Sequence, residues 1–218
     1  MKLVALCGRR PDAVWGRCAI PVGEALVTFA PEGVLWLSFG ESPKAEAELA
    51  EFWRGGSLVR DDAATQKLAD RIFEAGARAA DAQDASASAC AVQAVRPGRD
   101  ECSAQSASAQ ATVATDESTS GDINLLVEGT PFQIKVWQAL MEVPRGERIT
   151  YSELARRAGI PRAVRAAATA IGRNNISYLI PCHRIVPAVG GVGQYRWGPE
   201  VKRALLEWER VTSVGADL

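Results

Sequence analysis

A run of 39 residues in the middle of the chain, 82–120, most constrains what this sequence can fold into. It holds 11 alanines and 7 serines, no aromatic residue, and only three larger aliphatic side chains, Val92, Val95 and Val113. Such a segment cannot bury enough apolar surface to offset the entropy lost when it becomes ordered. The sequence therefore predicts a flexible linker or insertion at 82–120 between two folded domains, 1–81 and 121–218.

The first of these domains shows strand patterns followed by helical ones. Three strand-like runs lie at 15–22, 24–30 and 33–40, and turn residues separate them. Residues 43–53 and 61–80 then repeat apolar side chains at helical spacing. We predict a small α/β domain made of a short antiparallel sheet plus helices, and an α+β class for the whole chain. No catalytic grouping of residues stands out in this domain.

The composition excludes several classes of protein. The chain is 47% hydrophobic and 23% charged with a net charge of −1, which argues against global disorder and against a uniformly basic nucleic-acid coat. No apolar run approaches the roughly 20 residues that span a bilayer, and the apolar part of the N-terminus is too short for a signal peptide. The sequence therefore favours a cytoplasmic protein with no membrane partner.

Cysteine and histidine are too sparse to indicate a metal centre. The five cysteines form no CxxC pair, and His183 is the only histidine. A disulfide framework or a zinc site would need an even set of cysteines or further ligands at suitable spacing. We expect no metal and no cofactor.

Charge is distributed unevenly along the chain. Residues 1–120 contain 12 Lys+Arg and 17 Asp+Glu, whereas residues 121–218 contain 13 and 9. Within the second part, residues 154–199 hold seven arginines and no acidic residue. A solvated surface usually mixes both signs, so this stretch favours an anionic partner, and nucleic acid is the first candidate.

Capping patterns mark helix starts in the C-terminal domain. Thr130 followed by Pro131 is typical of an N-cap with proline at the first helical position. Thr150 and Glu153 fit a capping box at the start of a later helix. That assignment would set Tyr151 in the exposed first turn.

A second short helix follows the one that Thr150 opens. Gly159 ends the first helix and Pro161 is expected to open the next, at 162–173, which is the helix-turn-helix arrangement. Alanine fills most of this helix, and no acidic residue alternates with its arginines, so we favour DNA contact over a plain surface helix. Four residues share the predicted exposed stripe: Arg162, Arg165, Thr169 and Arg173. Three share the predicted core stripe: Val164, Ala168 and Ile171.

The only histidine lies beside a cysteine, in the segment IPCHR at 180–184. A cysteine with a pKa of about 8.5 is mostly protonated at neutral pH, so a reactive Cys182 needs a base. The imidazole of His183 could take the proton, directly or through water, and a carboxylate on its far nitrogen would fix the tautomer. If this segment is a strand, the side chains of Cys182 and His183 point to opposite sides of it. A buried cysteine with a structural role remains the alternative to a reactive one.

This segment resembles the active-site signature of the O6-alkylguanine-DNA alkyltransferases, which repair alkylated guanine in one irreversible turnover. The resemblance is strong over about 121–211 and weaker in the N-terminal part. The YRWG sequence at 195–198 is similar to bacterial members, including the C-terminal half of the adaptive-response protein. Further matching blocks occur in the family's order: GTPFQIKVW at 129–137, GERITYSELA at 146–155, AVRA at 163–166, Asn174, GQYRWG at 193–198, and a closing pattern from Lys202 to Glu209.

The resemblance implies a role for each residue at the reacting thiol. Cys182 would accept the alkyl group, and His183 would activate it through a bound water. Glu209, on the helix that Pro199 opens, would orient His183. Asn174 would brace the turn between the recognition helix and the active-site strand.

The resemblance also implies the contacts with DNA. Tyr151 would help rotate the target nucleotide out of the stack, and Arg165 would fill the space it vacates. Main-chain groups at Cys182 and Ile185 would read the guanine amino group. Tyr195 and Arg196 would lie on the loop that closes the alkyl pocket, and Arg162, Thr169 and Arg173 complete the predicted DNA-binding set.

The sequence therefore predicts DNA repair by direct reversal. A monomer would transfer the alkyl group of O6-alkylguanine in double-stranded DNA to its own Cys182, and O4-alkylthymine stays open as a second substrate. The alternatives are a non-catalytic lesion sensor, a helix-turn-helix regulator and a Cys-His hydrolase. A sensor would lack the acceptor cysteine, a regulator would carry longer polar side chains on its recognition helix, and a hydrolase would need an oxyanion hole.

Overall fold

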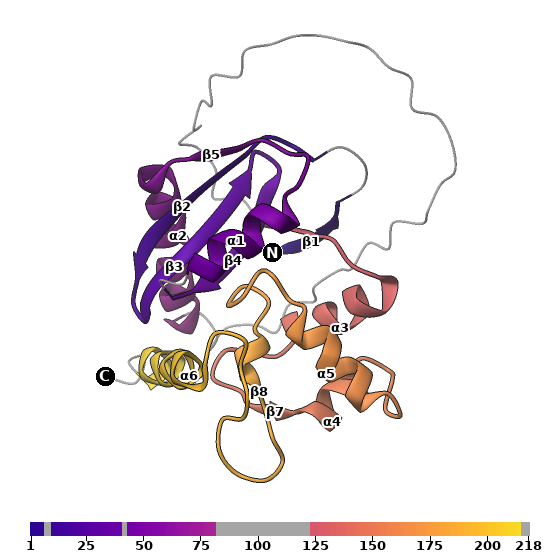
Figure 1. Ribbon diagram of the computed structural model, residues 1–218. Coiled ribbons are helices and arrows are strands. Elements are labelled where there is room, and N and C mark those ends of the chain that lie inside the picture. Colours follow the sequence, from indigo (N-terminus) through magenta and orange to yellow (C-terminus); the bar gives the residue numbers. More distant parts are fainter. Residues whose placement is uncertain (7–9, 41–42, 82–122, 215–218) are drawn as a thin grey trace.

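The computed structural model describes residues 1–6, 10–40, 43–81 and 123–214 (Figure 1). The predicted linker at 82–120 lies outside the described residues, together with Cys7, Cys90 and Cys102. A sheet flanked by helices occupies the upper part of the view, and a group of short helices occupies the lower part (Figure 1). Within the described ranges, no helix combines the length and apolar character needed to cross a bilayer.

The sheet has six strands in the order β1-β6-β4-β3-β2-β5. The central strands β2, β3 and β4 pair antiparallel, as the predicted hairpin turns require. The prediction of a short antiparallel sheet is wrong for the remaining pairs, because β1–β6, β4–β6 and β2–β5 are all parallel. Parallel pairs join segments that are distant in sequence and carry no hairpin turn to reveal them. The strands are β1 (Lys2–Ala5), β2 (Ala13–Ile20), β3 (Gly23–Ala30), β4 (Gly33–Phe39), β5 (Leu58–Arg60) and β6 (Asn124–Val127).

Strand β6 joins the N-terminal sheet although it follows the predicted linker. It lies between β1 and β4, whereas the sequence assigned Asn124–Val127 to the C-terminal domain. Leu125 and Leu126 are both buried, because a strand inside a sheet is covered on both faces. The chain therefore returns to the sheet before it builds the helical part.

Helices cover both faces of the sheet. Helix α1 (Pro43–Phe52) packs Leu49 on one face, against Leu26 and Trp36. Helix α2 (Asp62–Asp81) packs Ile72 on the other face, which also carries Val27. Successive side chains of β3 point to opposite faces of the sheet. Because α1 covers one face and α2 the other, residues in the middle of β3 are buried whichever way they point.

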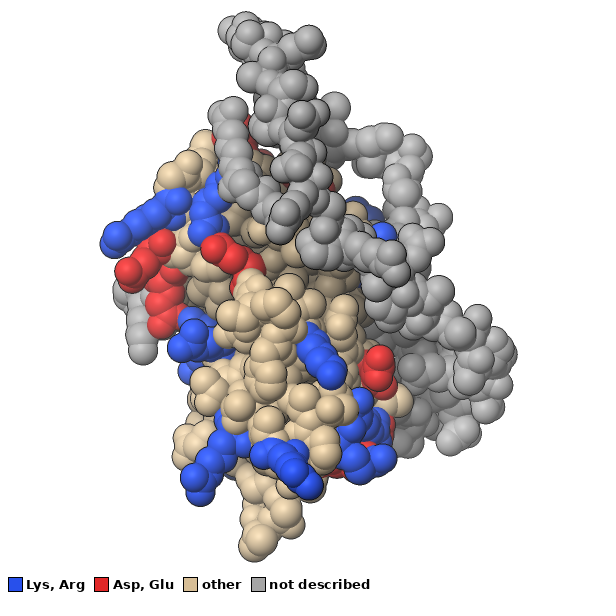
Figure 2. Space-filling model, turned by 90° about the vertical axis from the view of Figure 1, so that its right-hand side faces the viewer, with Lys and Arg blue, Asp and Glu red and all other residues tan. Residues whose placement is uncertain are grey.

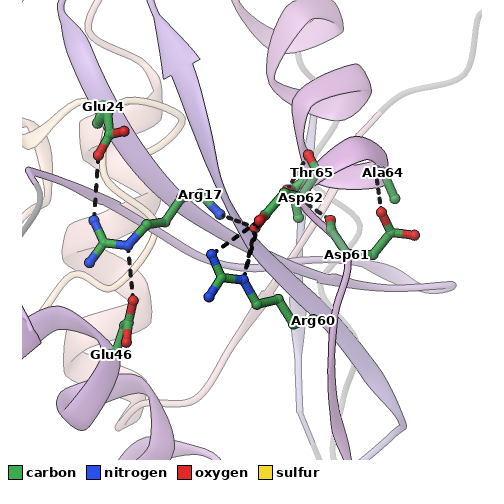
Figure 3. Close-up of polar contacts among 8 residues, drawn as sticks. All are labelled: Arg17, Glu24, Glu46, Arg60, Asp61, Asp62, Ala64 and Thr65. Atoms are coloured by element: carbon green, nitrogen blue, oxygen red, sulfur yellow. Dashed lines mark hydrogen bonds and ion pairs between the residues drawn. The ribbon is translucent and has the colours of Figure 1, made fainter.

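Hydrogen bonds and ion pairs at the surface connect α2 to strands β2 and β5 of the sheet (Figure 3). Asp61 Oδ1 accepts a hydrogen bond from the Ala64 N–H at 2.9 Å, which satisfies one free donor of the first helical turn. Asp62 accepts from the Arg17 N–H at 3.0 Å and from the Arg60 guanidinium at 3.0 Å. These contacts connect β2, β5 and α2, and all of them lie at the surface.

The C-terminal part consists of short helices around a two-stranded parallel ribbon. Its elements are α3 (Pro131–Met141), β7 (Ile149–Thr150), α4 (Tyr151–Arg157), α5 (Val164–Gly172), a 3-10 turn η1 (Cys182–Arg184), β8 (Ile185–Val186) and α6 (Pro199–Val214). The predicted N-cap at Thr130 is confirmed, and a reciprocal bond from the Thr130 N–H to Gln133 makes it a full capping box.

Two predicted helix starts need correction. Thr150 accepts the Glu153 N–H at 3.1 Å, but the Glu153 carboxylate binds Arg156 and Arg157 instead of closing the box. Helix α5 begins at Val164, two residues later than predicted, with no side-chain cap. On α5 the buried residues are Ala167, Ala170 and Ile171, so the predicted core stripe is shifted, since Val164 and Ala168 are only partly buried.

Candidate active site

The segment that leads to the candidate nucleophile is fastened to the N-terminal sheet. The Leu37 N–H of β4 donates to the Asn175 carbonyl at 2.9 Å, and the Ser177 N–H donates back to the Leu37 carbonyl at 2.9 Å. This pairing adds one parallel bridge to β4, between Leu37 and Ile176. The position of the reacting thiol therefore depends on the sheet as well as on the helices around it.

Cys182 and His183 lie in the 3-10 turn η1, and the predicted active-site strand is wrong at this point. Pro181 precedes the turn with φ −80° and ψ 62°, and the Cys182 N–H donates to the Ile180 carbonyl at 2.7 Å. This is the geometry of an inverse γ-turn, which a proline favours because its φ is restricted. The alternation expected of a strand therefore does not apply to the Cys-His pair.

Polar groups converge on the Cys182 sulfur. Asn174 Nδ2 donates to Sγ at 3.4 Å and to the Ile180 carbonyl at 2.9 Å, while its Oδ1 accepts the Ile176 N–H. The Tyr195 hydroxyl lies 3.7 Å from Sγ. Asn174 thus holds the chain before the turn and points a donor at the sulfur.

Two tyrosine hydroxyls near the sulfur stay protonated. Burial raises the pKa of Tyr151, and negative charge on Cys182 raises it further. The same two causes raise the pKa of Tyr195 well above its ordinary value. Neutral phenols can donate hydrogen bonds to an anion or to a bound base.

His183 and Glu209 form a fully buried pair, since neither side chain is exposed to solvent. His183 Nε2 lies 2.9 Å from Glu209 Oε1. Burial raises the pKa of Glu209, but the hydrogen bond from His183 and the Arg184 guanidinium outweigh that effect and hold the pKa at about 2. Arg184 donates to the same carboxylate at 2.7 Å and to the Val143 carbonyl at 2.6 Å, so it serves the structure of the site.

These contacts decide the tautomer of His183. Burial lowers the pKa of the imidazole, and the charges of Arg184 and Lys202 lower it further against the opposing effect of Glu209. A neutral imidazole must donate from Nε2 to the ionised Glu209, which leaves the lone pair on Nδ1. Nδ1 is buried and has no hydrogen-bond partner within the described parts of the chain. The site therefore holds a buried nitrogen base beside a buried thiol.

Lys202 is a member of the site whose role sequence reasoning missed. It is buried on α6, and its Nζ donates to the Ile185 carbonyl at 2.6 Å. Burial lowers the pKa of Lys202, and negative charge on Cys182 works in the opposite direction. The signal in the sequence was a lysine on the same helical stripe as Leu205, Leu206 and Glu209.

The arginine-rich stretch does not form one surface. Arg156 and Arg157 pair with Glu153, Arg157 also pairs with Glu147, and Arg184 pairs with Glu209. Within the described ranges, three arginines on or beside α5 have no ion pair: Arg162, Arg165 and Arg173. They are exposed together with Thr169, whose hydroxyl donates to the Arg165 carbonyl. Figure 2 shows basic side chains bordering a largely uncharged area on this side of the C-terminal part.

Arg196 contacts the N-terminal part of the molecule. It donates to Glu48 of α1 at 2.7 Å and to Asn175 Oδ1 at 3.0 Å, and it lies over the rings of Trp36 and Trp197. The Arg196 side chain is therefore engaged with α1, and the place of Arg196 on the loop that closes the alkyl pocket stays a prediction. Tyr195, the preceding residue, does lie at the thiol, and Ile185 is fully buried directly after η1.

The described residues contain no group of three or more His, Cys, Asp or Glu side chains that could hold a metal ion. Cys18, on β2, is buried far along the chain from the site, and its thiol donates to the Ala25 carbonyl. Burial raises the pKa of Cys18 to about 11, which makes it a poor nucleophile. Of the two cysteines that the structure describes, Cys182 is therefore the candidate nucleophile.

Comparison with known proteins supports the same region. Residues 131–211 match the family model described as 6-O-methylguanine DNA methyltransferase, DNA binding domain. The "Regulatory protein ada" of Salmonella typhimurium is 48% identical over 83 residues, which cover 38% of this chain and 24% of that protein. The methylated-DNA–protein-cysteine methyltransferase of Mycobacterium tuberculosis is 45% identical over 94 residues, which cover 43% of this chain and 57% of that protein.

The likeness of the folds extends over both parts of the chain. The crystal structure of Mycobacterium tuberculosis OGT in complex with DNA has a TM-score of 0.57 at 25% identity, and the match covers 92% of this chain and 94% of that chain. The mixed sheet with helices is therefore an alkyltransferase fold. Residues 131–211 of this chain are similar to the DNA-binding domain of the 6-O-methylguanine DNA methyltransferases, and the chain spans less than two thirds of the length of the curated relatives named above.

Proposed function

We propose that this chain repairs alkylated DNA by direct reversal. It transfers the alkyl group of O6-alkylguanine in double-stranded DNA to Cys182, once per molecule. The observation that carries this proposal is the buried thiol of Cys182 between Asn174 and Tyr195, next to a neutral His183 whose tautomer Glu209 fixes. The Mycobacterium tuberculosis relative named above is called a methylated-DNA–protein-cysteine methyltransferase, which supports this proposal.

The residues of the site supply each part of the reaction. Nδ1 of His183 takes the thiol proton, directly or through an intervening water. The Cys182 sulfur then attacks the alkyl carbon, a C–S bond forms, the C–O6 bond breaks, and guanine leaves with the bonding electron pair. The Asn174 donor and the Lys202 charge stabilise the thiolate, while Tyr151 donates a hydrogen bond to the extruded base. The thioether product is stable, which limits the protein to one turnover.

DNA binds to the face formed by α4 and α5, which act as a helix-turn-helix. The alkyl group on O6 is inside the duplex, so the nucleotide must rotate out at a cost of a few kcal/mol. Arg165 fills the vacated space, and Arg162, Thr169 and Arg173 contact the backbone. Exposed alanine on α5 allows the helix to approach the groove closely.

The remaining features follow from this assignment. The protein acts as a cytoplasmic monomer without a cofactor. Residues 121–218, less strand β6, form the DNA-binding and transfer domain, while residues 1–81 with β6 form the supporting domain. Main-chain groups at Cys182 and Ile185 read the guanine amino group.

Intact-mass measurement tests the proposal. The protein is incubated with duplex DNA that contains one O6-methylguanine, with C182S as the matched variant. We expect a single adduct of about 14 Da on the wild type, saturating at one per molecule and absent from C182S. Tight binding to the lesion without an adduct would instead support a lesion sensor. If the protein shows no adduct and no binding, it shares the fold of the alkyltransferases without their activity.

A further inference from the structure

Tyr178 connects the catalytic histidine to the N-terminal helix α2. Its ring stacks on the Phe73 ring of α2, with centroids 4.5 Å apart and an interplanar angle of 16°. On the catalytic side, its ring lies 6.0 Å from the His183 imidazole at an interplanar angle of 13°. Trp208 of α6 completes the cluster, 5.7 Å from Tyr178 and 5.5 Å from Phe73. Offset stacks at these separations are favourable contacts.

The backbone at Tyr178 adopts a conformation that tyrosine rarely takes. Its φ is +70°, and within the described parts of the chain no other residue except glycine has a positive φ. The Leu179 N–H donates to the Ser177 carbonyl at 2.9 Å, which closes a three-residue γ-turn centred on Tyr178. This turn type is strained for any residue except glycine, and it persists only where surrounding contacts impose it. The fold therefore keeps this ring beside His183 in spite of an unfavourable backbone.

The hydroxyl of Tyr178 makes only a long hydrogen bond, so the main contacts of this side chain are the stacking contacts of its ring. Arg145 donates to the Tyr178 hydroxyl at 3.4 Å, which is a long contact, and Arg145 also lies over Trp208. Burial raises the pKa of Tyr178 to about 12, so the side chain stays neutral. The charged groups that face the imidazole or the tyrosine from the neighbouring elements are Glu209 and Lys202 on α6, Arg184 on η1, and Arg145 after α3.

We propose that Tyr178 is a positioning residue for His183, and that its ring covers one face of the imidazole and holds the plane in which Nε2 meets Glu209. Nδ1 is thereby kept available to the thiol. Phe73 backs the tyrosine from the other side, so α2 supports the base from outside the matched family region at 131–211. The catalytic part of this inference rests on the proposed alkyl transfer.

Nuclear magnetic resonance tests the proposal without relying on activity, because His183 is the only histidine in the chain. The imidazole resonances are followed against pH in the wild type, Y178F and Y178L. We expect wild type and Y178F to share ring shifts and a midpoint below the ordinary value of about 6.5. In Y178L the ring-current shift is lost, and the midpoint moves toward that ordinary value because water reaches the uncovered face. Identical shifts and midpoints in a folded Y178L would overturn the proposal.

The rate of methyl transfer gives the second readout. Y178L should slow single-turnover transfer on the order of tenfold and move the acid limb of the pH–rate profile to higher pH, while Y178F stays within about twofold of the wild type. A wild type that transfers no methyl group refutes the proposed function, while the resonance result still decides whether Tyr178 positions His183. A wild type that transfers while Y178L matches it in both readouts refutes the positioning role alone.

A second variant covers the case in which Y178L does not fold. F73L removes the ring behind Tyr178 and leaves the tyrosine itself in place. We expect the His183 midpoint to move in the same direction as in Y178L and by a smaller amount. Unchanged resonances in F73L, with Y178L unfolded, would overturn the proposal.

Discussion

The two parts of this molecule treat charge in opposite ways. In the N-terminal part, Arg17, Arg60 and Asp62 form pairs at the surface (Figure 3), where water screens them. In the C-terminal part, His183 and Glu209 are fully buried, and Lys202 is 1% exposed. Among the described residues these three are the only buried His, Lys, Arg, Asp or Glu side chains, and all three belong to the candidate site. Burying charge is costly, so its concentration at one point marks the functional site more clearly than any motif.

The largest effect should come from removing the buried carboxylate. E209Q leaves the Arg184 guanidinium short of its counter-charge and the His183 tautomer unsupported, and we expect a loss of about 3–5 kcal/mol in the free energy of unfolding. E46Q removes the surface partner of Arg17 and should cost less than about 1 kcal/mol. Urea denaturation of both variants measures the difference. Equal losses would show that the comparison between buried and surface pairs does not hold.

The same site should make stability depend on pH. The folded-state pKa of Glu209 is about 2 against an ordinary 4.5, so its contribution is present above about pH 4.5 and is lost as pH falls toward 2. The lowered pKa of His183 acts in the same direction below its ordinary 6.5. The free energy of unfolding should therefore fall steadily from about pH 6.5 downward, by up to roughly 3 kcal/mol from Glu209 alone. A curve for E209Q as steep as that of the wild type would argue against this cause.

Replacing Arg165 and Arg196 in turn should distinguish a residue that contacts DNA from one that contacts the N-terminal part of the molecule. R165A should slow transfer from duplex DNA by about tenfold and leave the reaction with free O6-benzylguanine nearly unchanged, because its proposed role is to stabilise the rotated nucleotide. R196A removes the Glu48 contact beside Tyr195 and should slow both reactions by a similar factor. Single-turnover rates with both substrates check this. Equal losses on both substrates for R165A would remove its assigned role.

The smallest effect should come from Glu153, which shares a pKa of about 2 with Glu209 but is held there by the surface residues Arg156 and Arg157. E153Q should lower the melting temperature slightly at low salt and not at all at 1 M salt, where the screening length falls to about 3 Å. Thermal unfolding at the two salt concentrations measures this. A loss that persists at high salt would mean that the surface pair acts like the buried one.

Local patterns were sufficient for much of the fold. Hydrophobic alternation and turn residues predicted β2, β3 and β4, and helical spacing predicted α1 and α2 within a few residues. The capping signal at Thr130 was correct because a cap depends only on residues within one turn. The parallel strands β1, β5 and β6 left no comparable signal, since their partners lie far along the chain.

The sequence by itself determined which side chains could do chemistry. The residue types indicated a single histidine beside a cysteine, His183 and Cys182. The family resemblance added Glu209 as the carboxylate that orients the histidine. Only the tertiary structure decided that His183 meets Glu209 through Nε2, that Lys202 is buried at the same site, and that Arg196 turns toward Glu48. Burial, tautomer and pairing depend on contacts between residues far apart in sequence, such as Phe73 and Tyr178. Such contacts exist only after the chain has folded.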